Sequence, residues 1–538
     1  MTILILPRKN FEKDIEKLDE KMQEQIAMFG TPIESISDEA VHIEIFPNRP
    51  DLLSYGNYIN ALKSFLGKDI GLKKVNLNKP EKDFIVYVDK SVSKVRPYTV
   101  CSVVKDLKLD DNNIKEIIDI QEKLHLTLGR KRKKVAIGIY PLEKIKFPIS
   151  YKALNPEEIK FRPLGFNKEL NGKQILSQHP AGKEYGYLLN NFDKFPVFID
   201  SNHEILSMPP IINSDKTGKI SLDTKDIFIE CSGNDLNTLN KILNIIVLSL
   251  EFMGGKIYQI SIKGAENIIT PDFTPEKMNL SLLNLNKLLG LELKEDNVKK
   301  CLERMGYEYS KGIVKVPSYR ADVLHEVDLI EDIAIAYGYD KFIPEIPKIS
   351  TIGRTDFKET FKMKISDIFI GLGMIETMSY HLVNKDIIKN TEQNFKSFIE
   401  VKDSKTEYKF LRKDLTSCLL NILSKNLDVE YPQEIFQLGR VFDGFIEKEK
   451  LAVALISGNF TRLKQIIEYF SKMLDINLEI KNPKSFPSYF IDGRVAEIFF
   501  NNKPIGFLGE IHPKILNNFR LKMPVALFEI SIDDILNN

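Results

Sequence analysis

Four carboxylates gather around one predicted helix in the run PSYRADVLHEVDLIEDIAIAYGYDKF. Asp328, Glu331 and Asp332 are spaced i, i+3 and i+4, so they share one helix face, and Asp322 precedes the helix, where it can fold back over that face. No lysine is interleaved, so the carboxylates would repel one another unless a divalent cation neutralised them. An all-oxygen donor set favours a hard ion such as Mg²⁺ over zinc. The alternative is a solvated acidic face with Asp322 as the helix N-cap.

The element that must position these carboxylates is a helix with an apolar stripe. Leu329, Ile330, Ile333, Ala334, Ala336 and Tyr337 keep helical spacing, and Gly338 suits the helix end. Two further helices precede it and stop at Gly290 and Gly306, and the short strand GIVKVP leads into it. We therefore predict a small winged helical domain at residues 267–347.

The composition is that of a globular protein with several domains. The 538 residues are 43% apolar and 28% charged, which excludes a wholly disordered, collagen-like or membrane protein. The net charge is +1, so any contact with nucleic acid must come from a local patch. The four cysteines include no CxxC pair, which excludes a local zinc knuckle and a disulfide framework and predicts a reducing, cytoplasmic location.

The other regions predict a multidomain α+β fold. Residues 1–92 combine strands with an amphipathic helix over residues 11–29 and form an N-terminal α+β domain. Residues 93–266 alternate short strands with loops and end in a long helix at Leu236–Phe252. Residues 348–538 begin with a helix and continue as a large antiparallel sheet, in which Asn501–Asn502 marks a hairpin turn.

The acidic run closely resembles the signature of the phenylalanyl-tRNA synthetase β subunit, in its archaeal and eukaryotic form. The matching residues are Arg320, Asp322, His325, Glu326, Asp328, Leu329, Glu331, Asp332, Ala336, Tyr337, Gly338 and Tyr339. The resemblance implies that Asp322, Asp328, Glu331 and Asp332 hold Mg²⁺ in a site shared with the α subunit.

The run FPVFIDSNHEILSMPPIINSDKTGKISLDTKDIFIECSGND, which starts at Phe195, resembles the family's editing module, a mixed α/β domain that hydrolyses Tyr misattached to tRNA. A phenylalanine pocket rejects an isostere with an added hydroxyl by only ~10², so a second site must use that hydroxyl as a handle. The candidate pocket residues are Asn213, Ser214, Thr217, Glu230 and Ser232. The family pattern has Thr at Asn234, so this sequence lacks one hydroxyl there. No nucleophile–His–acid arrangement is present, which favours water placed by pocket groups and the terminal ribose of the tRNA.

The densest basic patch lies where the sequence resembles the entry into that module, in QEKLHLTLGRKRKKVAIGIY. Arg130, Lys131, Arg132 and Lys133 are candidate contacts with the tRNA backbone. The alternative is a solvated charged loop.

The C-terminal third resembles the catalytic-like module of the β subunit, which has a class II synthetase-like antiparallel sheet. Active copies carry Arg–x–Glu, whereas here Phe442 stands two residues after Arg440, and the last strand lacks the glycine run and the arginine. The module is therefore predicted to be a catalytically inactive copy. The resemblance implies that an α subunit binds ATP and Phe, that the two chains form an (αβ)₂ heterotetramer acting on tRNA(Phe), and that the elements after Phe357 make the α interface.

Two other functions stay open on the sequence. One is a scaffold subunit without editing, which the substitution at Asn234 favours. The other is a self-sufficient class II ligase, against which the missing ATP motifs argue.

Overall fold

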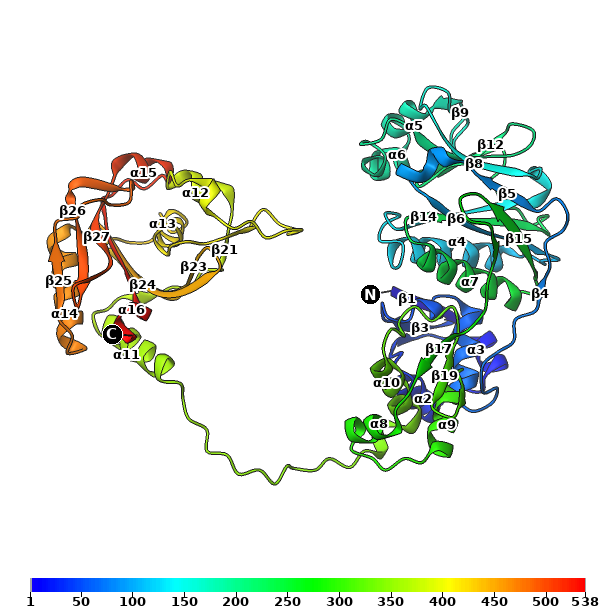
Figure 1. Ribbon diagram of the computed structural model, residues 1–538, viewed down its shortest axis with the longest axis horizontal. Coiled ribbons are helices and arrows are strands. Elements are labelled where there is room, and N and C mark those ends of the chain that lie inside the picture. Colours follow the sequence, from blue (N-terminus) through cyan, green and yellow to red (C-terminus); the bar gives the residue numbers. More distant parts are fainter. Residues whose placement is uncertain (1, 538) are drawn as a thin grey trace. The chain divides into compact units, whose positions relative to one another are not determined.

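A computed structural model describes residues 2–537 of the chain, which divides into two compact units, residues 1–346 and 347–538. Both units combine helices with sheets (Figure 1). The predicted multidomain fold that combines helices with sheets is therefore confirmed, while the descriptions of the single domains and their boundaries at 92/93, 266/267 and 347/348 stay predictions.

The first part of the larger unit is a three-stranded antiparallel sheet, β1 (Thr2–Pro7), β3 (Ala40–Ile45) and β2 (Ile33–Ile36), in that order. The single helix predicted over residues 11–29 is wrong, because α1 (Arg8–Asp14) and α2 (Glu20–Met28) are separate. Asp19 begins α2 by accepting a hydrogen bond from the amide of Met22 at 2.9 Å, which makes it an N-cap. Both helices bury apolar side chains, so the amphipathic pattern continues across the break. A third helix, α3 (Tyr55–Phe65), follows.

An eleven-stranded sheet dominates the middle of this unit. Its order is β13-β12-β11-β8-β5-β15-β6-β14-β7, with β16 and β4 paired to β15. The strands are β4 (Leu77–Asn78), β5 (Ile85–Val88), β6 (Tyr98–Lys105), β7 (Val135–Pro141), β8 (Ile149–Leu154), β11 (Phe195–Ile199), β12 (Ile205–Met208), β13 (Ile212–Asn213), β14 (Ile227–Gly233), β15 (Lys256–Lys263) and β16 (Ile268–Thr270). Every residue of β7 and β14 is buried, because the sheet is covered on both faces.

Two long helices, α4 (Asp111–Leu126) and α7 (Leu236–Phe252), share one hydrophobic core with β6, β7 and β14 (Figure 1). The long helix predicted at Leu236–Phe252 is confirmed. A small outlying part carries β9 (Lys160–Phe161), β10 (Leu170–Asn171), α5 (Gly172–Gln178) and α6 (Pro180–Tyr185).

The last part of the larger unit contains three helices and a three-stranded sheet of order β17-β19-β18. Its elements are β17 (Glu276–Asn279), α8 (Leu282–Leu289), α9 (Glu295–Arg304), β18 (Glu308–Ser310), β19 (Ile313–Val316) and α10 (Glu326–Tyr337). The predicted glycine stops are confirmed, since Gly290, Gly306 and Gly338 all have positive φ, a region that glycine enters without steric cost. The buried stripe of α10, including Leu329 and Ile333, joins the core of the larger unit.

The smaller unit is built on a seven-stranded sheet of order β20-β23-β24-β28-β27-β26-β25, antiparallel except for the β20–β23 pair. The strands are β20 (Ile375–Glu376), β23 (Gln433–Asp443), β24 (Ile446–Ile456), β25 (Leu478–Lys481), β26 (Phe490–Phe500), β27 (Lys503–Ile511) and β28 (Val525–Ser531). A separate pair is formed by β21 (Leu382–Val383) and β22 (Phe410–Leu411). The hairpin predicted at Asn501–Asn502 is confirmed, and both residues have positive φ, as a tight two-residue turn requires.

Helices cover both faces of this sheet. Apolar residues of α11 (Phe357–Gly371), α14 (Phe460–Met473) and α16 (Ile532–Leu536) pack into one core, and those of α13 (Thr416–Ser424) and α15 (Pro513–Asn518) pack into another. The short helix α12 (Lys385–Asn390) belongs to a third, smaller cluster. Among residues 2–537, no helix combines the length and the apolar character that crossing a lipid bilayer requires.

Candidate functional sites

A cavity of about 460 Å³ opens beside the edge of the large sheet. One wall is α4, which contributes Gln121, Glu122 and His125, and another is β7. The segment from Pro209 to Asn213 lines it from the opposite side, and Glu230 of β14 also reaches it. Apolar side chains of α4 and β7 supply most of the remaining surface, as expected for a site that accepts a small organic group.

Glu230 is the only acidic group of the sheet that lines this cavity within residues 2–537, and it is buried. The hydroxyl of Tyr140 donates a hydrogen bond to Oε1 of Glu230 at 3.1 Å, whereas Oε2 makes no hydrogen bond to the described chain. Burial raises the pKa of Glu230 to about 8, even though the Tyr140 hydroxyl and the charge of Arg96 oppose the shift. Glu230 is therefore mostly protonated at pH 7 and carries a proton that can be donated.

A glycine makes room for this pair. Gly138 on β7 lies opposite Glu230 in the strand register. A Cβ at Gly138 would lie 2.3 Å from the Tyr140 hydroxyl. The absence of a side chain at this position therefore lets the acid and the phenol meet.

The five predicted pocket residues divide into two groups. Asn213 and Glu230 line the cavity, and the Tyr140 hydroxyl lies 3.4 Å from Oδ1 of Asn213. Ser214, Thr217 and Ser232 are buried but are not among the lining residues. The Ser232 hydroxyl accepts a hydrogen bond from Nε of Arg96 at 3.2 Å, so its place is in the support beneath the cavity.

Sequence reasoning missed His125 and Glu122, which come from a helix about ninety residues before the predicted pocket segment in the chain. Nε2 of His125 accepts the Ile137 amide at 2.8 Å, and Nδ1 lies 3.2 Å from the Glu122 carboxylate. Nδ1 therefore carries the proton, and burial holds the pKa of His125 below its usual value. The i, i+3 spacing of Glu122 and His125 was the only signal in the sequence.

The predicted basic patch does not act as one surface. Arg130, Lys131 and Lys133 are exposed. Arg132 instead turns inward, and its guanidinium donates to the Ile211 carbonyl at 2.9 Å and to Glu122 at 3.0 Å. In this structure Arg132 ties α4 to the segment lining the cavity, and its contact with tRNA stays a prediction.

The four predicted metal ligands line one further cavity, of about 400 Å³, beside Asn48 and Arg49. Arg320, which is buried, donates to Asp322 at 2.6 Å and to Asp332 at 2.7 Å. The tyrosine hydroxyl of Tyr307 also hydrogen-bonds Asp332. The expectation of unrelieved repulsion is therefore wrong, because a guanidinium two residues before Asp322 already neutralises part of the cluster.

The charge states of this cluster follow from the ion pairs. Burial by itself would raise the pKa of Asp322, but the adjacent Arg320 outweighs it and holds the pKa below its usual value. Burial likewise opposes the charge on Arg320, yet Asp332 and Asp322 raise its pKa well above the usual range. Both partners therefore stay charged across ordinary pH.

The donors that are left differ in their freedom to bind a cation. Oδ2 of Asp328 accepts the amides of Leu324 and His325 and so caps α10, leaving its second oxygen free. Glu331 is exposed and forms no hydrogen bond or ion pair with residues 2–537. No three acidic, histidine or cysteine groups in that range converge closely enough to hold a metal. The residues of this chain therefore fit a cation through Asp328 and Glu331, with further ligands from elsewhere.

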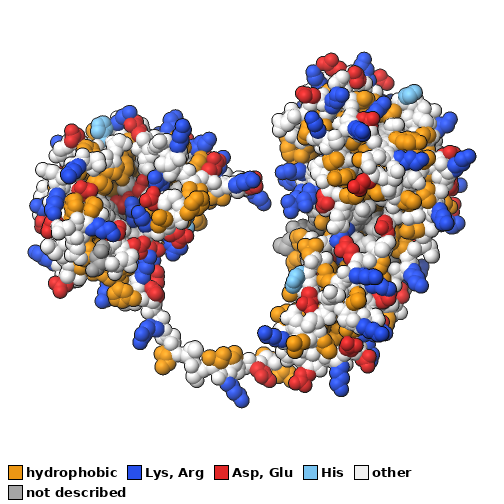
Figure 2. Space-filling view, in the orientation of Figure 1, with side chains coloured by type: hydrophobic (Ala, Val, Ile, Leu, Met, Phe, Trp, Pro, Cys, Tyr) orange, Lys and Arg blue, Asp and Glu red, His pale blue; other side chains and the backbone are white. Residues whose placement is uncertain are grey.

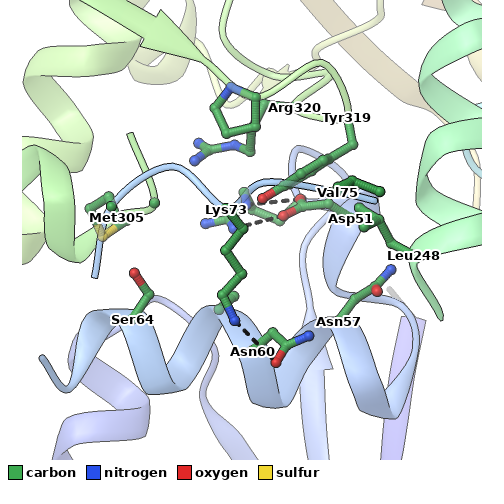
Figure 3. A pocket seen from close by; sticks show the side chains of 15 residues that line it. Asp51, Asn57, Asn60, Ser64, Lys73, Val75, Leu248, Met305, Tyr319 and Arg320 are labelled. Carbon is green, nitrogen blue, oxygen red and sulfur yellow. Dashed lines mark hydrogen bonds and ion pairs between the residues drawn. The ribbon is translucent and has the colours of Figure 1, made fainter. Parts of the chain in front are cut away.

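A small cavity of about 70 Å³ lies where the N-terminal part meets the segment before α10. Figure 3 shows Tyr319 and Arg320 facing Asn57, Asn60 and Ser64 of α3 across it. Asp51 pairs with Arg49 at 2.8 Å. The size of this cavity suits water molecules rather than a substrate, so we assign the cavity a structural role.

Comparison with known proteins shows which family has this sequence and in which of its domains these sites lie. The chain is 39% identical over 499 residues to the phenylalanine–tRNA ligase β subunit of Pyrococcus abyssi, covering 90% of this chain and 89% of the relative. It is 37% identical over 520 residues to that of Archaeoglobus fulgidus, covering 94% of each. The chain belongs to the phenylalanine–tRNA ligase β-subunit family.

Members of this family are parts of a ligase, an aminoacyl-tRNA synthetase that serves protein biosynthesis. Three family models match this β subunit: the B3/4 domain at residues 104–244, the tRNA synthetase B5 domain at 278–339 and the phenylalanyl-tRNA synthetase β-chain CLM domain at 343–532. The cavity that Glu230 lines falls in the first, and the acidic cluster falls in the second.

A solved structure supports the fold of the larger unit. An N-terminal fragment of the phenylalanyl-tRNA synthetase β subunit from Pyrococcus horikoshii is 37% identical and aligns with a TM-score of 0.59. The alignment covers 63% of this chain and the whole of the fragment.

Proposed function

We propose that this chain is the β subunit that completes a catalytic α subunit in the ATP-dependent attachment of Phe to tRNA(Phe). The observation that carries the proposal is the identity of 37–39% over at least 90% of the chain to β subunits of this ligase. In this arrangement the α subunit binds ATP and Phe, two αβ pairs form a heterotetramer, and the complex works in the cytoplasm.

The smaller unit acts as an inactive copy of a class II synthetase module with a winged helical domain before it. Support comes from Arg440, which pairs with Glu447 at 2.7 Å and lies near Glu449. Phe442 stands where active copies need Glu, and β28 has no arginine. With these groups absent, the sheet has no clamp for the phosphates of ATP, and its task is to support the α subunit.

The cavity at Glu230 is the site at which mischarged Tyr-tRNA(Phe) is hydrolysed. A neutral Glu230 offers a proton, and Asn213 offers both a donor and an acceptor to a phenol hydroxyl. A phenylalanine side chain would leave these buried polar groups without partners, which costs more than a lost contact. The pocket therefore selects tyrosine over phenylalanine, and water positioned by the site and by the terminal ribose attacks the ester.

Exposed cations next to the cavity guide the tRNA. Arg130, Lys131 and Lys133 stand on the turn that follows α4, beside the wall that Arg132 holds in place. Each phosphate neutralised would add salt-sensitive affinity. Arg132 contributes through the cavity wall instead.

Mg²⁺ is held at the rim of the acidic cluster by Asp328 and Glu331, with Asp322 and Asp332 behind them. The ion supplies positive charge that lets the acidic face approach the α subunit. Replacing Asp328 and Glu331 together by Ala should weaken association with α or lower the melting temperature of the complex. A double variant that assembles and melts like wild type, with and without chelator, would rule out the shared ion.

The first test is co-expression with the candidate α subunit, followed by mass determination and an assay of Phe-tRNA formation. The β chain alone should form no Phe-tRNA, and the two subunits together should form a heterotetramer that charges tRNA. A β chain that charges tRNA alone would point to a self-sufficient ligase. A working complex that releases no Tyr from Tyr-tRNA above background would support a scaffold without editing, which Asn234 would explain.

A further inference from the structure

The segment between the two units carries an apolar repeat that neither core uses. From Phe342 to Asp356 the chain forms neither helix nor strand. Four isoleucines in it, Ile343, Ile346, Ile349 and Ile352, are 86%, 93%, 74% and 100% exposed. Figure 2 shows apolar side chains along this segment. None of the hydrophobic clusters of the described chain includes them.

The spacing of these isoleucines is three residues throughout, which matches one kind of backbone. A polyproline II helix has three residues per turn, so side chains at i, i+3, i+6 and i+9 share one face. A β-strand would place alternate isoleucines on opposite faces. Pro344 and Pro347 exclude an α-helix through this region and fix φ near the polyproline II value.

The other two faces of such a helix are consistent with this assignment. One carries only polar or charged side chains, namely Glu345, Lys348, Thr351 and Arg354. The last carries Pro344, Pro347, Ser350 and Gly353. The segment therefore sorts into an apolar, a polar and a small or proline face, which gives an extended amphipathic rod.

A simple spacer has a different composition. Flexible or stiff linkers are built from Gly, Ser, Pro and charged residues, because exposed branched aliphatic side chains in them gain nothing and promote aggregation. A rod with four exposed isoleucines on one edge is instead suited to a groove, in the manner of proline-rich ligands that bind preformed.

We propose that residues 343–352 dock through this isoleucine edge into an apolar groove on the α subunit. The proposal rests on the proposed function, since it requires an α partner. Continuity along the chain favours that partner. The rod leads directly into elements whose exposed apolar side chains we assign to the α interface, among them Phe357, Ile375, Met378 and Tyr380. The polar edge stays toward water.

The test compares two pairs of substitutions in the full-length chain. Ile346→Ser with Ile349→Ser removes half of the apolar edge, and Glu345→Ser with Lys348→Ser is the matched control on the polar edge of the same turns. Titration with purified α subunit should show a Kd at least about tenfold higher for the isoleucine pair, and within about twofold of wild type for the control. Equal Kd values for the two pairs would overturn the proposal.

Two insertions test the three-residue period itself. One serine added after Lys348 turns Ile349 and Ile352 away from the first two isoleucines by a third of a turn, whereas three added serines restore the phase. The single insertion should weaken binding to α more than the triple insertion does. Equal weakening by both would mean that the rod has no such period, and the proposal would fail.

Other occupants of the edge give different results. If the isoleucine pair lowers the melting temperature of the isolated chain and leaves the Kd for α unchanged, the edge is covered within this chain, and the proposal is wrong. If the pair abolishes self-association of the isolated chain and leaves the Kd for α unchanged, a second copy covers it. If wild type does not bind α, the proposed function falls as well; if wild type binds and the isoleucine pair binds equally, only this inference falls.

Discussion

The larger unit encloses acidic groups at two places, and their pKa values are shifted in opposite directions. Glu230 is buried without a paired cation, and burial raises its pKa to about 8. Asp322 is partly buried, and the guanidinium of Arg320 at 2.6 Å holds its pKa below the usual value. These two carboxylates therefore differ in charge at pH 7.

The difference shows that the partner, rather than burial, decides what a buried acid can do. An acid without a cation becomes a neutral proton donor, which suits recognition of a hydroxyl group in the cavity. Acids that share a guanidinium stay charged and hold the segment before α10 against its helix. Under the proposed function, the first site does chemistry and the second builds the rim at which a metal and a partner meet.

The largest effect should follow from removing the shared cation. Arg320→Met removes the cation that pairs with the buried Asp332 and the partly buried Asp322, which should lower the free energy of unfolding by about 3–5 kcal/mol. Urea unfolding of the larger unit measures it. Lys315→Met, which breaks the exposed pair with Glu308, should change stability by less than about 1 kcal/mol. Similar losses for both variants would contradict the account of Arg320.

The second prediction is a substitution that raises the free energy of unfolding, and the size of the gain depends on pH. Because the pKa of Glu230 is raised above the 4.5 of an unfolded chain, the folded state keeps a proton that the unfolded state loses. The contribution of Glu230 to stability is therefore complete below about pH 4.5 and falls as pH rises toward 8. Glu230→Gln should remove this slope and be more stable than wild type at pH 8.5, by on the order of 3 kcal/mol.

The matched control for that experiment is Glu24→Gln, at an exposed position on α2. Its unfolding free energy should follow wild type at pH 5 and at pH 8.5. If Glu230→Gln also follows wild type at both values, then Glu230 is charged in the folded protein and the contrast between the two sites disappears.

The sequence predicted the acids of both sites but not their neighbours. The spacing of Asp328, Glu331 and Asp332 on one helix face could be read directly, because it depends only on helical periodicity. That Arg320 folds back between Asp322 and Asp332 depends on tertiary packing against Tyr307. A search for lysines interleaved on the helix could not predict this pairing of Arg320 with the two aspartates.

The cavity shows the same limit for a different reason. Asn213 and Glu230 were predicted because they stand in the segment that resembles an editing module. Tyr140 lies on β7, and the order β6-β14-β7 brings it beside Glu230, while His125 of α4 reaches the cavity by accepting a hydrogen bond from the Ile137 amide of β7. Sheet order is a non-local property, so neither residue could be placed from local patterns. The break in the first predicted helix at Asp19 was local, but the buried stripe continued across it.

A third prediction separates the wall of the cavity from its basic rim. Arg132→Ala removes charged hydrogen bonds to Glu122 and to the Ile211 carbonyl, so it should cost about 1–3 kcal/mol and speed amide exchange at residues 209–213. Lys133→Ala should leave both unchanged, and should instead lower tRNA affinity and reduce its salt dependence by about one unit of slope. If Arg132→Ala instead lowered tRNA affinity and Lys133→Ala lowered stability, Arg132 would be a tRNA contact rather than part of the cavity wall.

The smallest effect concerns the acidic face of α10. Asp328→Asn weakens the cap that accepts the amides of Leu324 and His325, and should lower stability by about 1 kcal/mol in the presence of a chelator. Glu331→Gln on the same face should stay within about 0.5 kcal/mol of wild type. An equal loss for both would mean that Glu331 has a structural partner in the folded chain.

The most direct test of the account measures two reactions of one purified αβ complex that carries Glu230→Gln. We predict that hydrolysis of Tyr-tRNA(Phe) falls by at least tenfold while the rate of Phe-tRNA(Phe) formation stays within twofold of wild type, as expected if the two reactions have separate sites. Unchanged hydrolysis of Tyr-tRNA(Phe), or an equal loss of both reactions, would contradict the assignment of editing to this cavity.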